Sequence, residues 1–211
     1  PTRGALQPFM LTLADIAAAL DRPPLGDRSD FDLNPHLRAR AEGASPRAAA
    51  VLCGLIQRPA GLQVVLTRRA AHLKHHGGQV AFPGGKVEPT DPSPSAAALR
   101  EAQEEIGLHP RQVRLMGQLD DHLTGTQFRV SPFVAEIDPA WEPVIDPGEV
   151  AEVFEAPLDF LMDPANRREE AYTKGTLTRR YYAMPWGRHH IWGATAGMLK
   201  GLADRLADPC A

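Results

Sequence analysis

One stretch of the sequence, from Phe82 to Leu108, constrains what this chain can fold into more than any other. It reads FPGGKVEPTDPSPSAAALREAQEEIGL, which is a Gly-Gly loop, a proline-rich connector and a segment with the end signals of a helix. Ser93 can cap the first turn through its hydroxyl, and Pro94 suits the first helical position because no N–H is needed there. Gly107 can adopt the left-handed conformation that ends many helices. The sequence therefore predicts a helix that begins after Ser93 and ends before Gly107.

The predicted helix has two different faces. Leu99, Ala102 and Ile106 recur at helical spacing and form an apolar stripe that can pack against a core. Three carboxylates stand three and four residues apart and are expected to face outward from that stripe: Glu101, Glu104 and Glu105. Because like charges on adjacent turns repel, this face is either a solvated acidic surface or a site for a cation. Mg²⁺ is a suitable partner, since it binds a few carboxylates, keeps several waters and recruits substrate phosphates.

The loop before the helix contains two adjacent glycines, Gly84 and Gly85. Glycine permits a positive φ and a close backbone approach, which a carbonyl contact to a metal or a cradle for phosphate requires. A simple turn explains a Gly-Gly pair equally well when the pair stands alone. The loop and the three clustered glutamates together form a more specific signal than either feature alone.

This combination resembles the Nudix box, in which a glycine is followed by five residues, a glutamate, seven residues and then Arg-Glu-apolar-x-Glu-Glu-x-Gly-apolar. Residues 100–108 match the end of that pattern at every position, and Gly85 fits its opening glycine. The middle departs from the pattern, because Asp91 stands where the first glutamate is expected and eight residues separate it from Arg100. The resemblance therefore leaves the role of Asp91 open.

A basic segment precedes the Gly-Gly loop. Its positive potential comes from Arg68, Arg69, Lys74, His75 and His76. The segment is either a solvated basic loop or a surface that attracts substrate phosphates. The two adjacent histidines are an alternative candidate for zinc binding, which is disfavoured because neighbouring side chains point apart on a strand.

The same region resembles a second signature, that of the coenzyme A pyrophosphatase branch of the Nudix family. That signature reads Leu-Thr-x-Arg-Ser/Ala, then a basic residue, then Gly and Phe-Pro-Gly-Gly at fixed spacing. The positions that fit are Leu66, Thr67, Arg69, Ala70, Gly78 and Phe82 to Gly85. Lys74 replaces the usual arginine, so this position can supply charge but not a planar pair of hydrogen bonds.

Composition narrows the class of protein. The chain has 211 residues and a net charge of −3, which argues against generic binding to nucleic acid or to a membrane surface. Its longest apolar run, residues 48–56, is too short for a membrane span and suits a buried strand. Cys53 and Cys210 form no CxxC motif, and the first ten residues lack the apolar region of a signal peptide. We therefore expect one domain over residues 1–211 in a reducing cytoplasm, with the oligomeric state left open.

The flanking segments supply further elements. Thr12 and Asp15 have the spacing of a capping box, which predicts a short helix. Residues 22–46, rich in proline, glycine and charge, are expected to form an extended connection. Residues 48–57 and 62–67 are predicted to form a β-hairpin about the turn signal Arg-Pro-Ala-Gly.

Further strands are predicted after the box, at residues 113–119 and 128–137. The polar residues between them, Asp120, Asp121 and His122, could face the site, but they are interpreted as plain loop residues. Four aromatic residues are assigned to a late strand and to the start of the last helix, where core packing is favoured over stacking on a base: Tyr181, Tyr182, Trp186 and Trp192.

The resemblance implies the Nudix α/β fold, a mixed β-sheet sandwiched between helices with the box helix against it. It also implies hydrolysis of the pyrophosphate bond of coenzyme A or its derivatives, with Mg²⁺ or Mn²⁺ as cofactor and a small molecule as the partner. One alternative is a Nudix pyrophosphatase for ADP-ribose or another nucleoside diphosphate derivative, which would not need the basic segment. An alternative of a different class is a non-catalytic Nudix-like binding module, which usually lacks some box glutamates.

The resemblance further implies roles for individual residues. The metal ligands would be Glu101, Glu104, Glu105 and the carbonyl of Gly85. Arg100 would orient a box carboxylate, and either Glu104 or Glu149 would activate the water. The substrate-binding residues would be Arg69, Lys74, Gly84 and Gly85.

Overall fold

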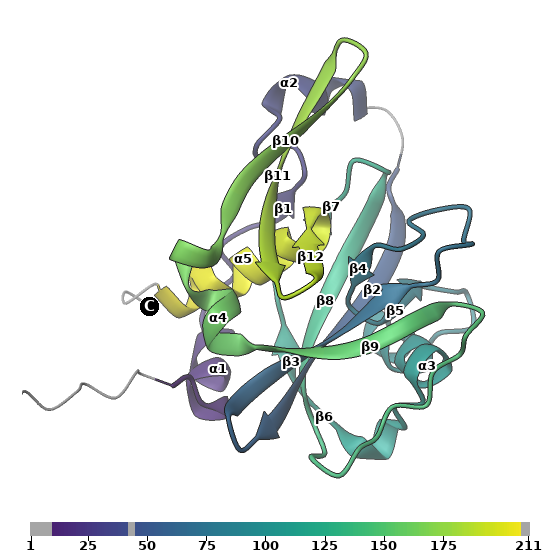
Figure 1. The fold of residues 1–211 in the computed structure, drawn as a ribbon, viewed down its shortest axis with the longest axis vertical. Coiled ribbons are helices and arrows are strands. Elements are labelled where there is room, and N and C mark those ends of the chain that lie inside the picture. Colours follow the sequence, from purple (N-terminus) through teal and green to yellow (C-terminus); the bar gives the residue numbers. More distant parts are fainter. Residues whose placement is uncertain (1–9, 42–44, 208–211) are drawn as a thin grey trace, which may run out of the picture.

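The computed structural model describes residues 10–41 and 45–207 (Figure 1). Residues 1–9 of the N-terminal stretch, which lacks the apolar region of a signal peptide, therefore lie outside the described residues, as does Cys210. Among those residues, no helix is both long and apolar enough to cross a membrane.

The larger sheet is mixed and contains nine described strands. Its path runs β1-β7-β8-β2-β3-β4, with β5 paired to β2, β6 to β8 and β9 to β3. Strands β2 and β8 are parallel, whereas β3 is antiparallel to β2, β4 and β9. The strands are β1 (Arg28–Ser29), β2 (Arg47–Arg58), β3 (Gly61–Arg69), β4 (Val80–Ala81), β5 (Gly84–Lys86), β6 (Val113–Gln118), β7 (His122–Leu123), β8 (Phe128–Ile137) and β9 (Val150–Pro157).

Three more strands form a separate antiparallel sheet, and helices lie on both sides of the larger one (Figure 1). The smaller sheet consists of β10 (Arg168–Lys174), β11 (Leu177–Trp186) and β12 (His189–Trp192). The helices are α1 (Leu13–Leu20), α2 (Pro35–Ala41), α3 (Pro94–Ile106), α4 (Leu158–Met162) and α5 (Gly193–Ala207), with short 3₁₀ turns η1 (Pro110–Gln112) and η2 (Pro164–Asn166). The α/β fold class expected from the sequence is confirmed.

Alternation along β3 divides the core into two clusters on opposite faces of the sheet. Val64 and Leu66 point to one face and pack with α1, α4, α5 and the smaller sheet. Val65 points to the other face and packs with α3 and the buried Trp141. Because the side chains of a strand alternate between faces, the last two residues of β3, Arg68 and Arg69, are directed to different sides as well.

The local end signals predicted for two helices are present. The Ser93 hydroxyl accepts a hydrogen bond from the Ala96 N–H, and Gly107 has the left-handed φ of 66°. In α1, Thr12 and Asp15 form the reciprocal capping box. Strands β2 and β3 form the predicted hairpin, which closes at the pair Arg58–Gly61.

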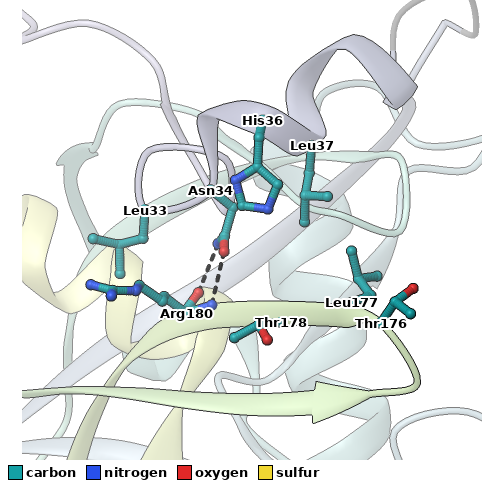
Figure 2. Close-up of a pocket in the computed structure, with 8 residues that line it drawn as sticks. All are labelled: Leu33, Asn34, His36, Leu37, Thr176, Leu177, Thr178 and Arg180. Atoms are coloured by element: carbon teal, nitrogen blue, oxygen red, sulfur yellow. Dashed lines mark hydrogen bonds between the residues drawn. The ribbon is translucent and has the colours of Figure 1, made fainter.

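The expectation of an extended connection over residues 22–46 is wrong for its described part. Strand β1 and helix α2 lie within it, and Phe31 and Leu37 are buried. Figure 2 shows how this segment is bonded to β11: the Asn34 amide donates to the carbonyl oxygen of Arg180 and accepts from its N–H, both at 2.8 Å. A pocket of about 730 Å³ lies between α2 and the tip of the β10–β11 hairpin, and no residue of the Nudix-like box lines it.

The loop residues before β8 also have long-range partners. Asp120 forms an ion pair with Arg205 of α5, and only 3% of either side chain is exposed. His122 is buried and lies 2.8 Å from a carboxylate oxygen of Asp30. Interpreting these two residues as plain loop residues was therefore wrong, because Asp120 pairs with α5, and His122 begins β7 and bonds to the N-terminal segment.

Candidate active site

The residues singled out in the sequence meet where α3 packs beside β5 and the end of β3. Helix α3 supplies the glutamates and Arg100, β5 supplies Gly84 and Gly85, and β3 ends at Arg69. Strand β5 pairs with β2 through the register Val51–Gly84 and Ala50–Gly85, so the sheet itself places the glycines. The apolar face of α3 holds the helix against this edge, with Ala102 and Ile106 fully buried and Leu99 partly buried.

Both glycines are required by close approaches. Gly84 has a φ of 153°, and a Cβ there would lie 2.4 Å from the Ala50 carbonyl oxygen. A Cβ on Gly85 would lie 2.5 Å from the Glu101 carboxylate. The loop is therefore more than a simple turn, because Gly84 lies against the backbone of β2 and a side chain at Gly85 would fit only if the Glu101 carboxylate moved.

The three box glutamates differ sharply in exposure. The exposed fraction of the side chain is 60% for Glu104, 16% for Glu101 and 2% for Glu105. The expectation that all three face outward is therefore wrong for Glu105. Its carboxylate accepts hydrogen bonds from the Gly84 N–H at 3.1 Å and from the Arg69 guanidinium at 3.2 Å.

Burial raises the pKa of the Glu105 carboxyl to about 7, because its charged form loses contact with water. The Gly84 N–H and Arg69 oppose this rise, whereas the charges of Glu101 and Glu149 add to it. The pKa of Glu101 is also raised, chiefly by burial. Arg100 opposes this rise, whereas the charges of Glu104 and Glu149 add to it. The charge of Glu149, which immediately precedes β9, thus acts on two box glutamates.

Arg100 links the box glutamates Glu101 and Glu104 to Asp91, which lies in the proline-rich connector between β5 and α3. Its guanidinium donates to Glu101 at 3.0 Å and to Glu104 at 2.9 Å. On the other side it donates to both carboxylate oxygens of Asp91, at 3.0 and 3.1 Å. Asp91 also accepts the Glu88 N–H, and these contacts lower its pKa, with Arg100 the larger cause. Asp91, whose role the sequence left open, therefore holds Arg100 in place. The sequence did not indicate this contact, because eight rather than the expected seven residues separate Asp91 from Arg100.

The donor chemistry of this group fits a hard divalent cation. Carboxylate and backbone carbonyl oxygens are the ligands that Mg²⁺ and Mn²⁺ prefer. As placed, no three acidic, histidine or cysteine side chains in the described part of the chain converge closely enough to hold one ion. Arg100 and Arg69 already pair with these carboxylates, and Mg²⁺ needs only one or two carboxylates because it keeps several waters. The close approach of the Glu101 carboxylate to the Gly85 backbone is the feature that favours such a ligand.

The two basic residues assigned to substrate lie in different surroundings. Arg69 contacts Glu105, and its backbone closes the basic loop (residues 70–79) by bonding to Gly78 and Gln79 at 3.1 and 2.9 Å. Lys74 is exposed within that loop. Arg68 points to the opposite face of the sheet and pairs with Glu152 at 3.1 Å.

Comparisons with known proteins bear on the family and the fold. The model of the NUDIX domain family matches residues 46–175. The uncharacterized Nudix hydrolase NudL of Salmonella paratyphi B is 42% identical over 170 residues, which cover 78% of this chain and 85% of that protein. The protein of the same name from Salmonella newport gives the same values. The crystal structure of a Nudix hydrolase from Alicyclobacillus acidocaldarius covers 76% of this chain and 92% of its own, at 20% identity and a TM-score of 0.51, and supports the fold alone. The family match over more than half of the chain and the NudL relatives show that this protein belongs to the Nudix hydrolase family.

Proposed function

We propose that this Nudix hydrolase cleaves the pyrophosphate bond of coenzyme A or its acyl derivatives. The products are 4′-phosphopantetheine, or its acyl form, and adenosine 3′,5′-bisphosphate. The observation that carries the proposal is the course of the basic loop. It begins directly after Arg69, which contacts Glu105, and returns through β4 to Gly84 and Gly85. The segment that resembles the coenzyme A signature therefore begins and ends at the carboxylate site.

The reaction is governed by charge. Water attacks one phosphorus, the bond from that phosphorus to the bridging oxygen breaks, and the bridging oxygen leaves on the other phosphate. A bound Mg²⁺ or Mn²⁺ would neutralise phosphate charge and lower the pKa of a water molecule. We assign its binding to the carbonyl of Gly85 and to one or two of the box glutamates Glu101, Glu104 and Glu105, because Mg²⁺ keeps several of its waters. Phosphoryl transfer depends chiefly on positioning and electrostatics, which a rigid loop and a packed helix provide.

Two carboxylates are candidates for accepting the proton of the attacking water. Glu104 is exposed and bonded to Arg100, whereas Glu149 is exposed in the segment before β9. We favour Glu149, because the Glu104 carboxylate already accepts a hydrogen bond from Arg100 at 2.9 Å. Arg100 serves to orient Glu101 and Glu104, and Asp91 holds Arg100 in turn.

A product assay tests the proposal. Coenzyme A, ADP-ribose and a set of nucleoside triphosphates are incubated with the protein and Mg²⁺ or Mn²⁺. We expect coenzyme A to have the highest kcat/KM and Glu101→Gln to lower turnover by about two orders of magnitude, the scale of losing a charge-stabilising group. Higher kcat/KM for ADP-ribose would assign the protein to the alternative substrate class. Absence of turnover on the whole panel, with binding retained, would support a binding module.

A further inference from the structure

The segment from Asp138 to Glu149, which we call the crossing loop, passes over the C-terminal end of α3. The last carbonyls of a helix have no partner within the helix, so they need one from elsewhere. Here the Val144 N–H donates to the Ile106 carbonyl oxygen, and the Asp146 N–H donates to that of Glu105, both at 3.0 Å. The crossing loop is thus bonded to the backbone of a box glutamate.

Asp146 also organises the turn that follows. Its side-chain Oδ1 accepts the Gly148 N–H at 2.8 Å. Its carbonyl oxygen accepts the N–H groups of Glu149 at 3.1 Å and Val150 at 2.9 Å. One residue therefore bonds to α3 through its N–H and to the three residues around Glu149 through its side chain and carbonyl.

Glu149 is fixed from its other side as well. Its carbonyl oxygen accepts the N–H of Ala70, the first residue of the basic loop, at 2.8 Å. Its side chain is exposed, yet its charge contributes to the raised pKa of both Glu101 and Glu105. The backbone of Glu149 is held at two points while its carboxylate remains free to act.

We propose that Asp146 is a positioning residue that sets the place of Glu149 relative to the box helix. The inference rests on the proposed function, because it assigns Glu149 a part in the reaction. The Asp146 side chain does not act on substrate; it holds the turn from which Glu149 projects. A displacement of about 1 Å at a reacting group can lower the rate about a hundredfold, so a small relaxation of this turn is enough to be measured.

A double-mutant cycle tests this role. Asp146→Ala, Asp146→Asn and Glu149→Gln are compared with the combined variant Asp146→Ala/Glu149→Gln. We expect Asp146→Ala to lower kcat roughly tenfold to a hundredfold with little change in KM. Asparagine keeps an oxygen that can accept the Gly148 N–H, so Asp146→Asn should recover most of the loss. In the Glu149→Gln background, Asp146→Ala should cause little further loss, because it acts through the missing carboxylate.

Asp138 provides a matched control in the same loop. Its Oδ1 accepts the Ala140 N–H at 2.9 Å, the same local contact at the start of the loop, 11 positions before Glu149. Asp138→Ala should therefore leave kcat unchanged. Amide hydrogen exchange gives a readout independent of activity: Asp146→Ala should lose protection at Gly148, whose N–H bonds to the side chain of Asp146, and Asp146→Asn should keep it.

The outcomes separate the inference from the function it rests on. If Glu149→Gln is fully active, the assigned role of Glu149 falls, and the positioning role falls with it. If Glu149→Gln is impaired but Asp146→Ala is not, only the inference about Asp146 is overturned. If Asp146→Ala lowers kcat equally in both backgrounds, Asp146 supports the fold rather than Glu149. If Asp146→Ala does not fold, Asp146→Asn remains as the test. The positioning role requires this variant to be active, so an Asp146→Asn variant as impaired as Glu149→Gln would overturn that role.

Discussion

At the scale of the residue, Gly85 shows how one absent methyl group can control a site. A Cβ there would lie 2.5 Å from the Glu101 carboxylate, which is closer than real atoms approach. We expect Gly85→Ala to displace Glu101 and to lower kcat by about two orders of magnitude, comparable with loss of the carboxylate itself. Gly201 in α5 is the control, because nothing lies within 4 Å of its Cβ position and Gly201→Ala should stabilise the helix by about 1 kcal/mol. Wild-type kcat for Gly85→Ala would contradict the close approach.

Arg69 and Lys74 give a second prediction at this scale. Coenzyme A carries a 3′-phosphate that dephospho-coenzyme A lacks, and a charge-assisted contact to such an anion contributes about 1.5–3 kcal/mol. Lys74 is exposed, so Lys74→Ala should lower kcat/KM roughly tenfold to a hundredfold for coenzyme A and barely for dephospho-coenzyme A. Arg69 contacts Glu105, so Arg69→Ala should lower kcat/KM for both substrates alike. Equal losses with Lys74→Ala would remove Lys74 from recognition of the 3′-phosphate.

At the scale of the element, Glu152 joins the two sheets. It lies on β9 and accepts hydrogen bonds from Arg68 on β3, from Arg188 in the β11–β12 turn and from His189 on β12 when that ring nitrogen is protonated. The His189 ring also stacks on Phe154 of β9, with ring centroids 3.6 Å apart. The turn between β11 and β12 is thus bonded to the larger sheet by one carboxylate and one ring contact.

The pKa of Glu152 makes this link sensitive to acid. Arg188, then His189 and Arg68, lower the pKa of its carboxyl to about 2, from an ordinary value of 4.5. A lowered folded-state pKa contributes stability above pH 4.5 that is lost as the pH falls toward 2. Arg188 is 77% exposed, so solvent screening reduces the contribution to about 1–2 kcal/mol. We expect urea unfolding at pH 6 and pH 3 to show a smaller loss of stability for Glu152→Gln than for wild type. Equal losses would show that the contacts of Glu152 do not persist in solution.

At the scale of the whole molecule, buried charges and amides tie the N-terminal segment to the rest of the chain. Asp120 pairs with Arg205 and also accepts the Gly26 N–H at 3.2 Å. Arg28 pairs with Asp204 of α5 at 2.9 Å, and Asn34 bonds to β11. Residues before 46 and after 175 lie outside the matched family domain, and these contacts join the two segments to each other.

The Asp120–Arg205 pair supplies a prediction at this scale. Asp120→Ala leaves a buried guanidinium without its partner, and we expect the free energy of unfolding to fall by about 3–5 kcal/mol. The exposed pair Arg114–Glu136 is the control, since Arg114→Ala should cost at most about 1 kcal/mol. Both variants should keep wild-type kcat at a temperature where they are folded. Urea unfolding measures the difference, and similar effects of the two substitutions would mean that water reaches the Asp120–Arg205 pair.

The sequence by itself determined the local features of this protein. The ends of α3, the capping box of α1 and the β2–β3 hairpin depend on residues within a few positions of each other, so their signals can be recognised along the chain. The Nudix family and the α/β fold class were also predictable, because the box is a contiguous motif. The assignment of catalytic, metal and substrate roles to individual residues stays a prediction.

The tertiary structure decided which partners these residues have. Glu105 is buried because α3 packs beside β5. Its partner Arg69 lies 36 positions earlier in the sequence. The segment of residues 22–41 bonds to β11 through Asn34, which lies 146 positions from its partner Arg180. Helical periodicity states which residues share a face, but it does not state what lies opposite that face. That depends on which distant strand or loop packs there, and the free energy of burial and pairing is set only when the distant segments meet.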